Sequence, residues 1–231
     1  IYKTSIENNS TEIIYAHKYG ANTAREDSTG SLWFTQSTEN QNEERLFGAL
    51  DKATPDGALY RLSFSEDGFA SKPELVIDNL YFANGFYIDE GKNKLYLSEM
   101  MKNRVLVFDL DVSTGSLSNQ TTLAIMPTPD NMELNSEGDL WVASPLSNQI
   151  LSIDVESGAV TVVFDAQTDI GFESMKTGIE RIENGEGFAD LLSPELTGDM
   201  PGLLTGMILG DESQPFYVAN LGTALIQVAK K

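Results

Sequence analysis

Four polar residues of this chain have side chains that could together bind a cation. Three are asparagines that stand at the same place in successive, similar segments: Asn22 in GANTARED, Asn84 in FANGFYID and Asn131 in PDNMELNS. The fourth is Asp130, which precedes Asn131. Amide and carboxylate oxygens are hard ligands of modest total charge, and they match Ca²⁺ better than a soft transition metal. If the repeat aims these side chains at a shared point, the sequence predicts a calcium site there.

A simpler interpretation of the asparagines is turn chemistry. Asn84 precedes Gly85, and Asn131 follows Pro129 and Asp130, so each could be selected for its backbone conformation alone. Taken singly, each residue favours that interpretation. Three asparagines in register favour the shared site.

The elements that would position these residues are short, repeated β-strands separated by turn clusters such as DSTG, DEGKN and NSEGD. Each asparagine lies ten to twelve residues before an aromatic side chain in an apolar run, namely Trp33, Tyr96 and Trp141. The clearest repeat predicts strands at 84–89, 94–99, 104–110 and 121–126, and the next predicts strands at 131–135, 139–144, 149–154 and 159–165. Four antiparallel strands in each repeat of about 40–45 residues are typical of a β-propeller blade.

Further strands extend this pattern in both directions. Residues 22–78 form another predicted blade with outer strands at 58–64 and 74–78, a fourth is expected at 203–209, 215–220 and 224–229, and residues 1–6 and 11–17 resemble the last two strands of a blade. Because an open fan leaves unpaired edges, we expect an all-β fold that forms about two thirds of a six-bladed ring, its N-terminal part absent from this sequence. A compact ring with fewer blades is the alternative.

Two segments interrupt the repeat. Residues 37–57 form a polar insertion between the second and third strands of the first blade, and residues 166–202 carry helical spacing in place of alternation. Both belong to connections on the face where the asparagines start their strands. We therefore expect the insertions to wall a central pocket on that face.

Composition excludes several classes of function. The 231 residues suit one domain, 1–231, and the apolar runs are shorter than the roughly 20 residues that span a bilayer. A net charge of −20 repels phosphate backbones, so nucleic acid is not an expected partner. The chain has no cysteine and a single histidine, which excludes thiolate catalysis and a histidine-based zinc site. We expect a soluble protein, while compartment (cytoplasmic, periplasmic or secreted) and oligomeric state stay open.

The succession of GANTARED, STGSLWFTQS, DNLYFANGFYID, KNKLYLSEMMKNRVLVFDLD and PTPDNMELNSEGDLWVAS resembles the SMP-30/gluconolactonase, paraoxonase and strictosidine-synthase-like superfamily. The resemblance implies a six-bladed propeller with a catalytic calcium in its tunnel. Asn22, Asn84, Asp130 and Asn131 match the metal positions, whereas the glutamate expected from the first blade has no match. Thr23 stands where paraoxonase-like members place an aspartate for a second, structural calcium, so the resemblance does not extend to that second ion.

The main hypothesis from the sequence is a calcium-dependent hydrolase of lactones or related esters, similar to gluconolactonases and arylesterases. The ion would polarise the substrate carbonyl, and Asp130 would activate water or serve only as a ligand. The alternative is a propeller used as a non-catalytic binding or interaction module, with a structural metal or none, because this fold hosts unrelated functions.

Overall fold

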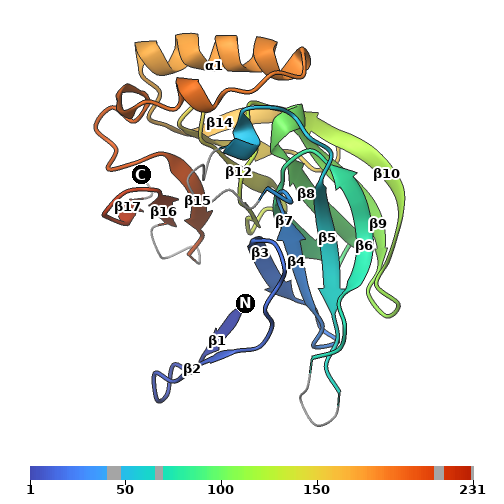
Figure 1. Cartoon of the computed structure of the whole chain (residues 1–231). Helices are drawn as coiled ribbons and strands as arrows, with labels where there is room; N and C mark the ends of the chain where they lie inside the picture. Colours follow the sequence, from blue (N-terminus) through green and yellow to red (C-terminus); the bar gives the residue numbers. More distant parts are fainter. Residues whose placement is uncertain (41–47, 66–69, 211–215, 230–231) are drawn as a thin grey trace.

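The structure, a computed structural model, describes residues 1–40, 48–65, 70–210 and 216–229. Its strands form four radial antiparallel sheets and one hairpin (Figure 1). The first sheet contains β3 (Ala21–Glu26), β4 (Leu32–Gln36), β5 (Gly57–Leu62) and β6 (Glu74–Leu80). The second contains β7 (Ala83–Asp89), β8 (Lys94–Glu99), β9 (Arg104–Asp111) and β10 (Ser116–Ile125). The third contains β11 (Met132–Leu134), β12 (Leu140–Ser144), β13 (Gln149–Ile153) and β14 (Val160–Asp165).

The remaining strands form smaller sheets. The fourth sheet contains β15 (Leu204–Ile208), β16 (Phe216–Asn220) and β17 (Ile226–Val228), and the hairpin contains β1 (Tyr2–Thr4) and β2 (Thr11–Ile13). Sheets of consecutive antiparallel strands arranged in this way form a β-propeller, so the predicted all-β propeller is confirmed. The prediction of six blades is not confirmed, because the described residues form four such sheets. Strand patterns indicate which sheets a chain forms, but they do not determine how many blades a closed ring contains.

The predicted strands agree with the observed ones to within a few residues, and the largest difference is at β10. This strand begins at Ser116, five residues before the predicted start at 121, and its pairing with β9 is irregular between Ser118 and Thr121. Asn119 lies in this irregularity with a φ of 51°. The bulge breaks the alternation that the sequence pattern relies on, so the first half of the strand was missed.

The helical insertion predicted at 166–202 is confirmed. It contains α1 (Asp169–Glu183) and the short 3-10 helices η4 (Ala189–Leu191) and η5 (Pro194–Leu196). Thr168 caps α1, since its side chain accepts a hydrogen bond from the Gly171 backbone N–H. None of the helices among the described residues is both long and apolar enough to cross a bilayer. In the 37–57 insertion, residues 41–47 lie outside the described residues, and η2 (Gly48–Leu50) follows them.

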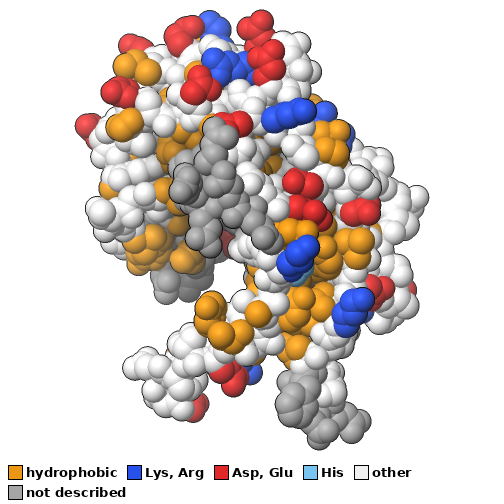
Figure 2. Space-filling view, in the orientation of Figure 1, with side chains coloured by type: hydrophobic (Ala, Val, Ile, Leu, Met, Phe, Trp, Pro, Cys, Tyr) orange, Lys and Arg blue, Asp and Glu red, His pale blue; other side chains and the backbone are white. Residues whose placement is uncertain are grey.

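The mixture of charged and apolar side chains differs from one part of the surface to another. Figure 2 shows side chains of both charges over the helical insertion, whereas hydrophobic side chains face the hollow beside the N-terminal hairpin. His17 lies among the rings of Tyr15, Phe34 and Tyr60, and its Nε2 is 2.8 Å from Gln36 Oε1. The histidine is therefore part of an aromatic cluster on the first sheet.

The repeated aromatic residues fill the space between successive sheets. Trp33 packs with Phe86 and Leu97 between the first and second sheets, and Tyr96 packs with residues of the third. Trp141 meets Phe216 of the fourth sheet edge to face, with ring centroids 5.3 Å apart. One aromatic in each repeat thus supplies much of the apolar area that holds neighbouring blades together.

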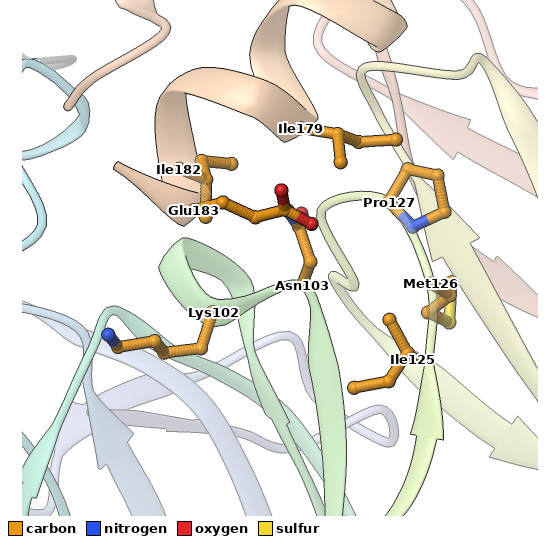
Figure 3. A pocket seen from close by; sticks show the side chains of 8 residues that line it. All are labelled: Lys102, Asn103, Ile125, Met126, Pro127, Ile179, Ile182 and Glu183. Atoms are coloured by element: carbon orange, nitrogen blue, oxygen red, sulfur yellow. The ribbon is translucent and has the colours of Figure 1, made fainter. Parts of the chain in front are cut away.

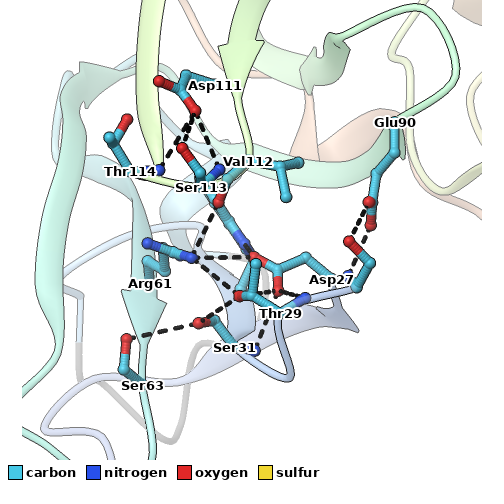
Figure 4. Close-up of polar contacts among 12 residues, drawn as sticks. Asp27, Thr29, Ser31, Arg61, Ser63, Glu90, Asp111, Val112, Ser113 and Thr114 are labelled. Atoms are coloured by element: carbon cyan, nitrogen blue, oxygen red, sulfur yellow. Dashed lines mark hydrogen bonds and ion pairs between the residues drawn. The ribbon is translucent and has the colours of Figure 1, made fainter.

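A buried aspartate, Asp27, stabilises the turn that joins β3 to β4 in the first sheet. The Asp27 carboxylate accepts hydrogen bonds from the backbone N–H groups of Thr29 and Ser31 and from Trp33 Nε1, and Arg61 lies 3.4 Å away (Figure 4). Burial opposes its ionisation, but the hydrogen bonds outweigh that effect and hold the pKa of Asp27 below its usual value. This carboxylate is fully satisfied.

The inner strands of the second and third blades approach each other closely at Gly85. A Cβ atom at this position would lie 2.5 Å from Asn131 Cα and 2.7 Å from the Asp130 carbonyl oxygen. Only glycine allows β7 to pack directly against the backbone that leads into β11. This contact brings Asn84 beside Asp130.

We predict that Gly85→Ala destabilises the protein by about 1–3 kcal/mol, because backbone atoms must move to admit the methyl group. Chemical denaturation of the purified protein measures this loss. Gly20→Ala is the matched control, since a Cβ there meets no atom within 4 Å. Equal stability of the two variants would contradict the close packing of the two blades.

Candidate functional site

The four predicted site residues lie at the starts of the inner strands. Asn22 is in β3, Asn84 is in β7, and Asp130 and Asn131 directly precede β11. The strand pairing is irregular at two of these starts, between Ala21 and Ala24 and between Ala83 and Phe86. Such bulges redirect side chains, and here they occur where the asparagines stand.

Hydrogen bonds connect residues of this site across blades. The Asn22 side chain lies beside Thr23, whose hydroxyl donates to Asn131 Oδ1 at 2.7 Å. Asn131 Nδ2 donates to Asp130 Oδ1 at 3.0 Å and to the Thr205 carbonyl oxygen at 2.9 Å. The Asn84 side chain lies close enough to the Asp130 carboxyl group to favour the ionised form of that group. The structure thus groups Asn84, Asp130 and Asn131, whereas the Asn22 side chain donates to Ser37 Oγ at 2.8 Å and is linked to the group through Thr23.

Hydroxyl groups of the second strands hold the site backbone in place. Thr35 Oγ1 donates to the Asn84 carbonyl oxygen and Ser98 Oγ donates to the Asp130 carbonyl oxygen, both at 2.7 Å. Both hydroxyl-bearing residues are fully buried. Each links one blade to the site residue of the next, so the site and the contact between blades depend on the same bonds.

The sequence reasoning missed these supporting residues. Thr35 stands two residues after Trp33, and Ser98 stands two residues after Tyr96. This repeated spacing of a hydroxyl residue after the aromatic is the sequence signal that could have identified them. Thr205 was also missed. It lies at an irregularity of β15 between Leu204 and Gly206, the fourth-blade counterpart of the other strand starts.

The Asp130 carboxyl group is buried without a positive partner. It is 5% exposed, and none of the ion pairs among the described residues includes it. Desolvation therefore raises the pKa of Asp130 to about 8, although hydrogen bonds from Asn131 and Asn84 act in the opposite direction. Asp27, with the same exposure, has its pKa shifted the other way because its hydrogen bonds prevail.

The residues present fit a hard cation such as Ca²⁺. Asn84 is 2% exposed, and its Oδ1 is buried without a hydrogen-bond partner, although an unpaired buried acceptor normally costs about 1–3 kcal/mol. A cation beside Asn84 Oδ1 and the Asp130 carboxylate would satisfy both groups. Within the described parts of the chain, no three His, Cys, Asp or Glu side chains cluster closely enough to hold a metal. A site here must therefore use amide oxygens.

Comparison with known proteins identifies the family. The profile of the SMP-30/Gluconolactonase/LRE-like region matches residues 6–170, which include all four site residues. The chain belongs to this family. The resemblance inferred from the sequence motifs is therefore confirmed.

Individual relatives are more distant. Regucalcin of Danio rerio is 33% identical over 85 residues, which cover 35% of this chain and 29% of that protein. A gluconolactonase structure from Xanthomonas campestris has a TM-score of 0.61 at 16% identity, covering 97% of this chain and 63% of that one. A regucalcin from Agrobacterium tumefaciens, described as a calcium-binding protein, has a TM-score of 0.55 at 15% identity, covering 86% and 52%. The chain spans less than half the length of the curated relatives that it matches.

The pKa of Asp130 is raised and that of Asp27 is lowered, so replacing each by asparagine should change the stability in opposite directions. The prediction applies to calcium-free protein in the presence of EDTA. Asp130→Asn should raise the free energy of unfolding at pH 7 by roughly 1–3 kcal/mol, because the folded state no longer disfavours an ionised carboxylate. Since the folded-state pKa of Asp130 is raised, the gain should be absent below about pH 4 and grow towards pH 8. Denaturation at several pH values measures it.

Asp27→Asn is the matched variant with the opposite expectation. It should lower the free energy of unfolding by about 1–3 kcal/mol at pH 7, because the hydrogen bonds of Asp27 favour the ionised form. Its pKa is depressed, so this loss should diminish as the pH falls through the acidic range. The same sign for both variants at pH 7 would contradict the electrostatic difference between the two sites.

Proposed function

We propose that this protein is a calcium-dependent hydrolase of lactones or related esters. The observation that supports the proposal is that Asn22, Asn84, Asp130 and Asn131 stand at the inner-strand starts of three blades, with a buried Asn84 oxygen that accepts no hydrogen bond from the described residues. Membership of a family named for gluconolactonase agrees with this chemistry. The calcium-binding regucalcin of similar fold agrees with the choice of ion.

In this proposal Asn22, Asn84, Asp130 and Asn131 hold the ion. Asn84 Oδ1 and the Asp130 carboxylate are the central donors, because both are buried and close together. A bound Ca²⁺ would act as a Lewis acid that polarises a substrate carbonyl. Asn131 holds the Asp130 carboxylate from one side, and Thr23 fixes the orientation of the Asn131 amide.

Asp130 is the proposed catalytic residue. Its carboxylate would accept a proton from the water that attacks the carbonyl carbon, which is general-base catalysis. Asn84 and Asn131 orient the carboxylate through their amide groups, and Ser98 fixes its backbone. General-base catalysis requires the ionised form of Asp130, whereas burial of the carboxyl group disfavours that form, since it raises the pKa.

The two insertions are proposed to select the substrate. Leu50 of the 37–57 insertion and Phe188 of the 166–202 insertion belong to one apolar cluster, with the Phe188 backbone N–H bonded to the Leu50 carbonyl oxygen at 2.9 Å. The insertions thus support each other. In the proposal, the two insertions together form one wall of the substrate pocket.

The proposal predicts that EDTA treatment abolishes hydrolysis of a lactone such as γ-butyrolactone, and that added calcium restores it. Asp130→Ala should abolish both calcium binding, measured by calorimetry, and hydrolysis, because it removes the only carboxylate among the proposed ligands. Asp111→Asn, at the exposed end of β9, is the matched control and should retain both properties.

Full lactonase activity in EDTA-treated protein would contradict calcium dependence. Calcium binding that depends on Asp130, without hydrolysis of any lactone or aryl ester tested, would instead favour the alternative of a metal-stabilised binding module. The two measurements therefore separate the ion site from the reaction.

A further inference from the structure

A second cavity lies outside the proposed ion site, between α1 and the second blade. Its volume is about 420 Å³, within the range of small-molecule pockets. Figure 3 shows that it is bounded by the C-terminal half of α1, by the segment after η3 (Met100–Lys102) and by the end of β10. Ile125, Ile179 and Ile182 form part of its apolar wall.

One buried residue that lines this cavity carries a polar group without a partner among the described residues. Asn103 is 5% exposed, and its Nδ2 has no hydrogen-bond partner among those residues, so its amide hydrogens are unpaired. Its Oδ1 accepts the Thr128 backbone N–H at 3.0 Å, so the oxygen faces Thr128 and the NH₂ is the end of the amide that is left without a partner. Leaving such a donor unpaired costs about 1–3 kcal/mol. The geometry therefore calls for an acceptor that no described residue supplies.

The charges around the cavity define that acceptor. The Glu183 carboxylate reaches over the cavity towards Asn103 (Figure 3), and the whole chain carries a net charge of −20. The Lys102 ammonium lies 4.1 Å from the centroid of the Tyr81 ring and is engaged there. An anionic ligand would thus be repelled by Glu183, whereas a neutral carbonyl oxygen could accept from Asn103.

We propose that this cavity is a binding site for a small, neutral aliphatic molecule that carries a carbonyl group, such as an amide, ester or lactone. The carbonyl oxygen accepts from Asn103 Nδ2, and the aliphatic part packs against Ile125, Ile179 and Ile182. The site is distinct from the proposed ion site, although Asn103 also holds Thr128, two residues before Asp130. The proposal depends on neither calcium nor hydrolysis.

Hexanamide is the probe, because it combines a neutral carbonyl with an aliphatic chain. Titration into protein with ¹³C-labelled isoleucine methyl groups should shift the Ile125 and Ile179 signals saturably, with a dissociation constant on the order of 1 mM. Hexanoate, the anion with the same chain length, should bind at least about tenfold more weakly. The absence of saturable shifts with hexanamide would overturn the proposal.

Two variants test the assigned contacts. Asn103→Asp keeps an oxygen for the Thr128 N–H and removes only the donor, so hexanamide binding should weaken by about tenfold or more. Because a buried carboxylate could unfold the protein, Ile179→Trp provides a second test by filling the cavity from α1, with the same expected loss. Ile170→Trp is the matched control, since Ile170 is 55% exposed on α1 and does not line the cavity.

Hexanamide binding that is unchanged in both cavity variants would overturn the assignment of the site. A second contradictory result concerns Glu183. If Glu183→Ala lowers the stability of the free protein while hexanamide does not bind, then Glu183 is the acceptor for Asn103 and the cavity has no ligand of this class.

Discussion

The burial of the Asp130 carboxyl group is the constraint on which the candidate site depends. A carboxylate removed from water must be neutralised by protonation, by hydrogen bonds or by a cation. Asp27 shows the hydrogen-bond solution, with donors from one turn and from Trp33. Among the described residues, Asp130 has amide donors and no basic partner, and the nearby Asn84 Oδ1 accepts no hydrogen bond from them. Without a cation, the raised pKa of Asp130 favours the protonated form. In the proposed site a cation would neutralise the carboxylate and bind the Asn84 oxygen as well.

The propeller creates this arrangement through contacts between blades. Gly85 lets β7 approach the backbone before β11, while Thr35 and Ser98 fix the carbonyl groups of Asn84 and Asp130 from the preceding blade. Arg25 adds a further link, because its guanidinium donates to backbone carbonyls in β7 and β11. The site is therefore held by the same contacts that set the positions of the sheets. These bonds form without a ligand, so the backbone of the site is held in place as a preorganised ion site would require.

Most of the strands and the positions of the site residues could be predicted from the sequence, because the same residue types recur at equivalent positions of each repeat. The asparagines, the aromatic residues and the turns recur together, so the strands and the convergence of Asn22, Asn84 and Asn131 followed from one alignment. Three features could not be predicted, since each depends on contacts between residues that the repeat pattern does not relate. They are the bulge at Asn119, the cavity at Asn103 and the hydrogen bond from Thr23 to Asn131. The six-bladed ring was an inference about closure, and strand patterns within these residues do not determine it.

The family match and the geometry of the site both agree with the proposed lactone hydrolase. The profile match covers the three blades that contribute the site, whereas the fourth sheet lies beyond it and contributes Thr205 through its backbone. The most direct test of the account is a crystal structure of the protein grown with calcium. We predict an ion about 2.3–2.6 Å from both Asn84 Oδ1 and an Asp130 carboxylate oxygen. A calcium ion bound only elsewhere on the chain, with Asn84 and Asp130 free of it, would contradict the account.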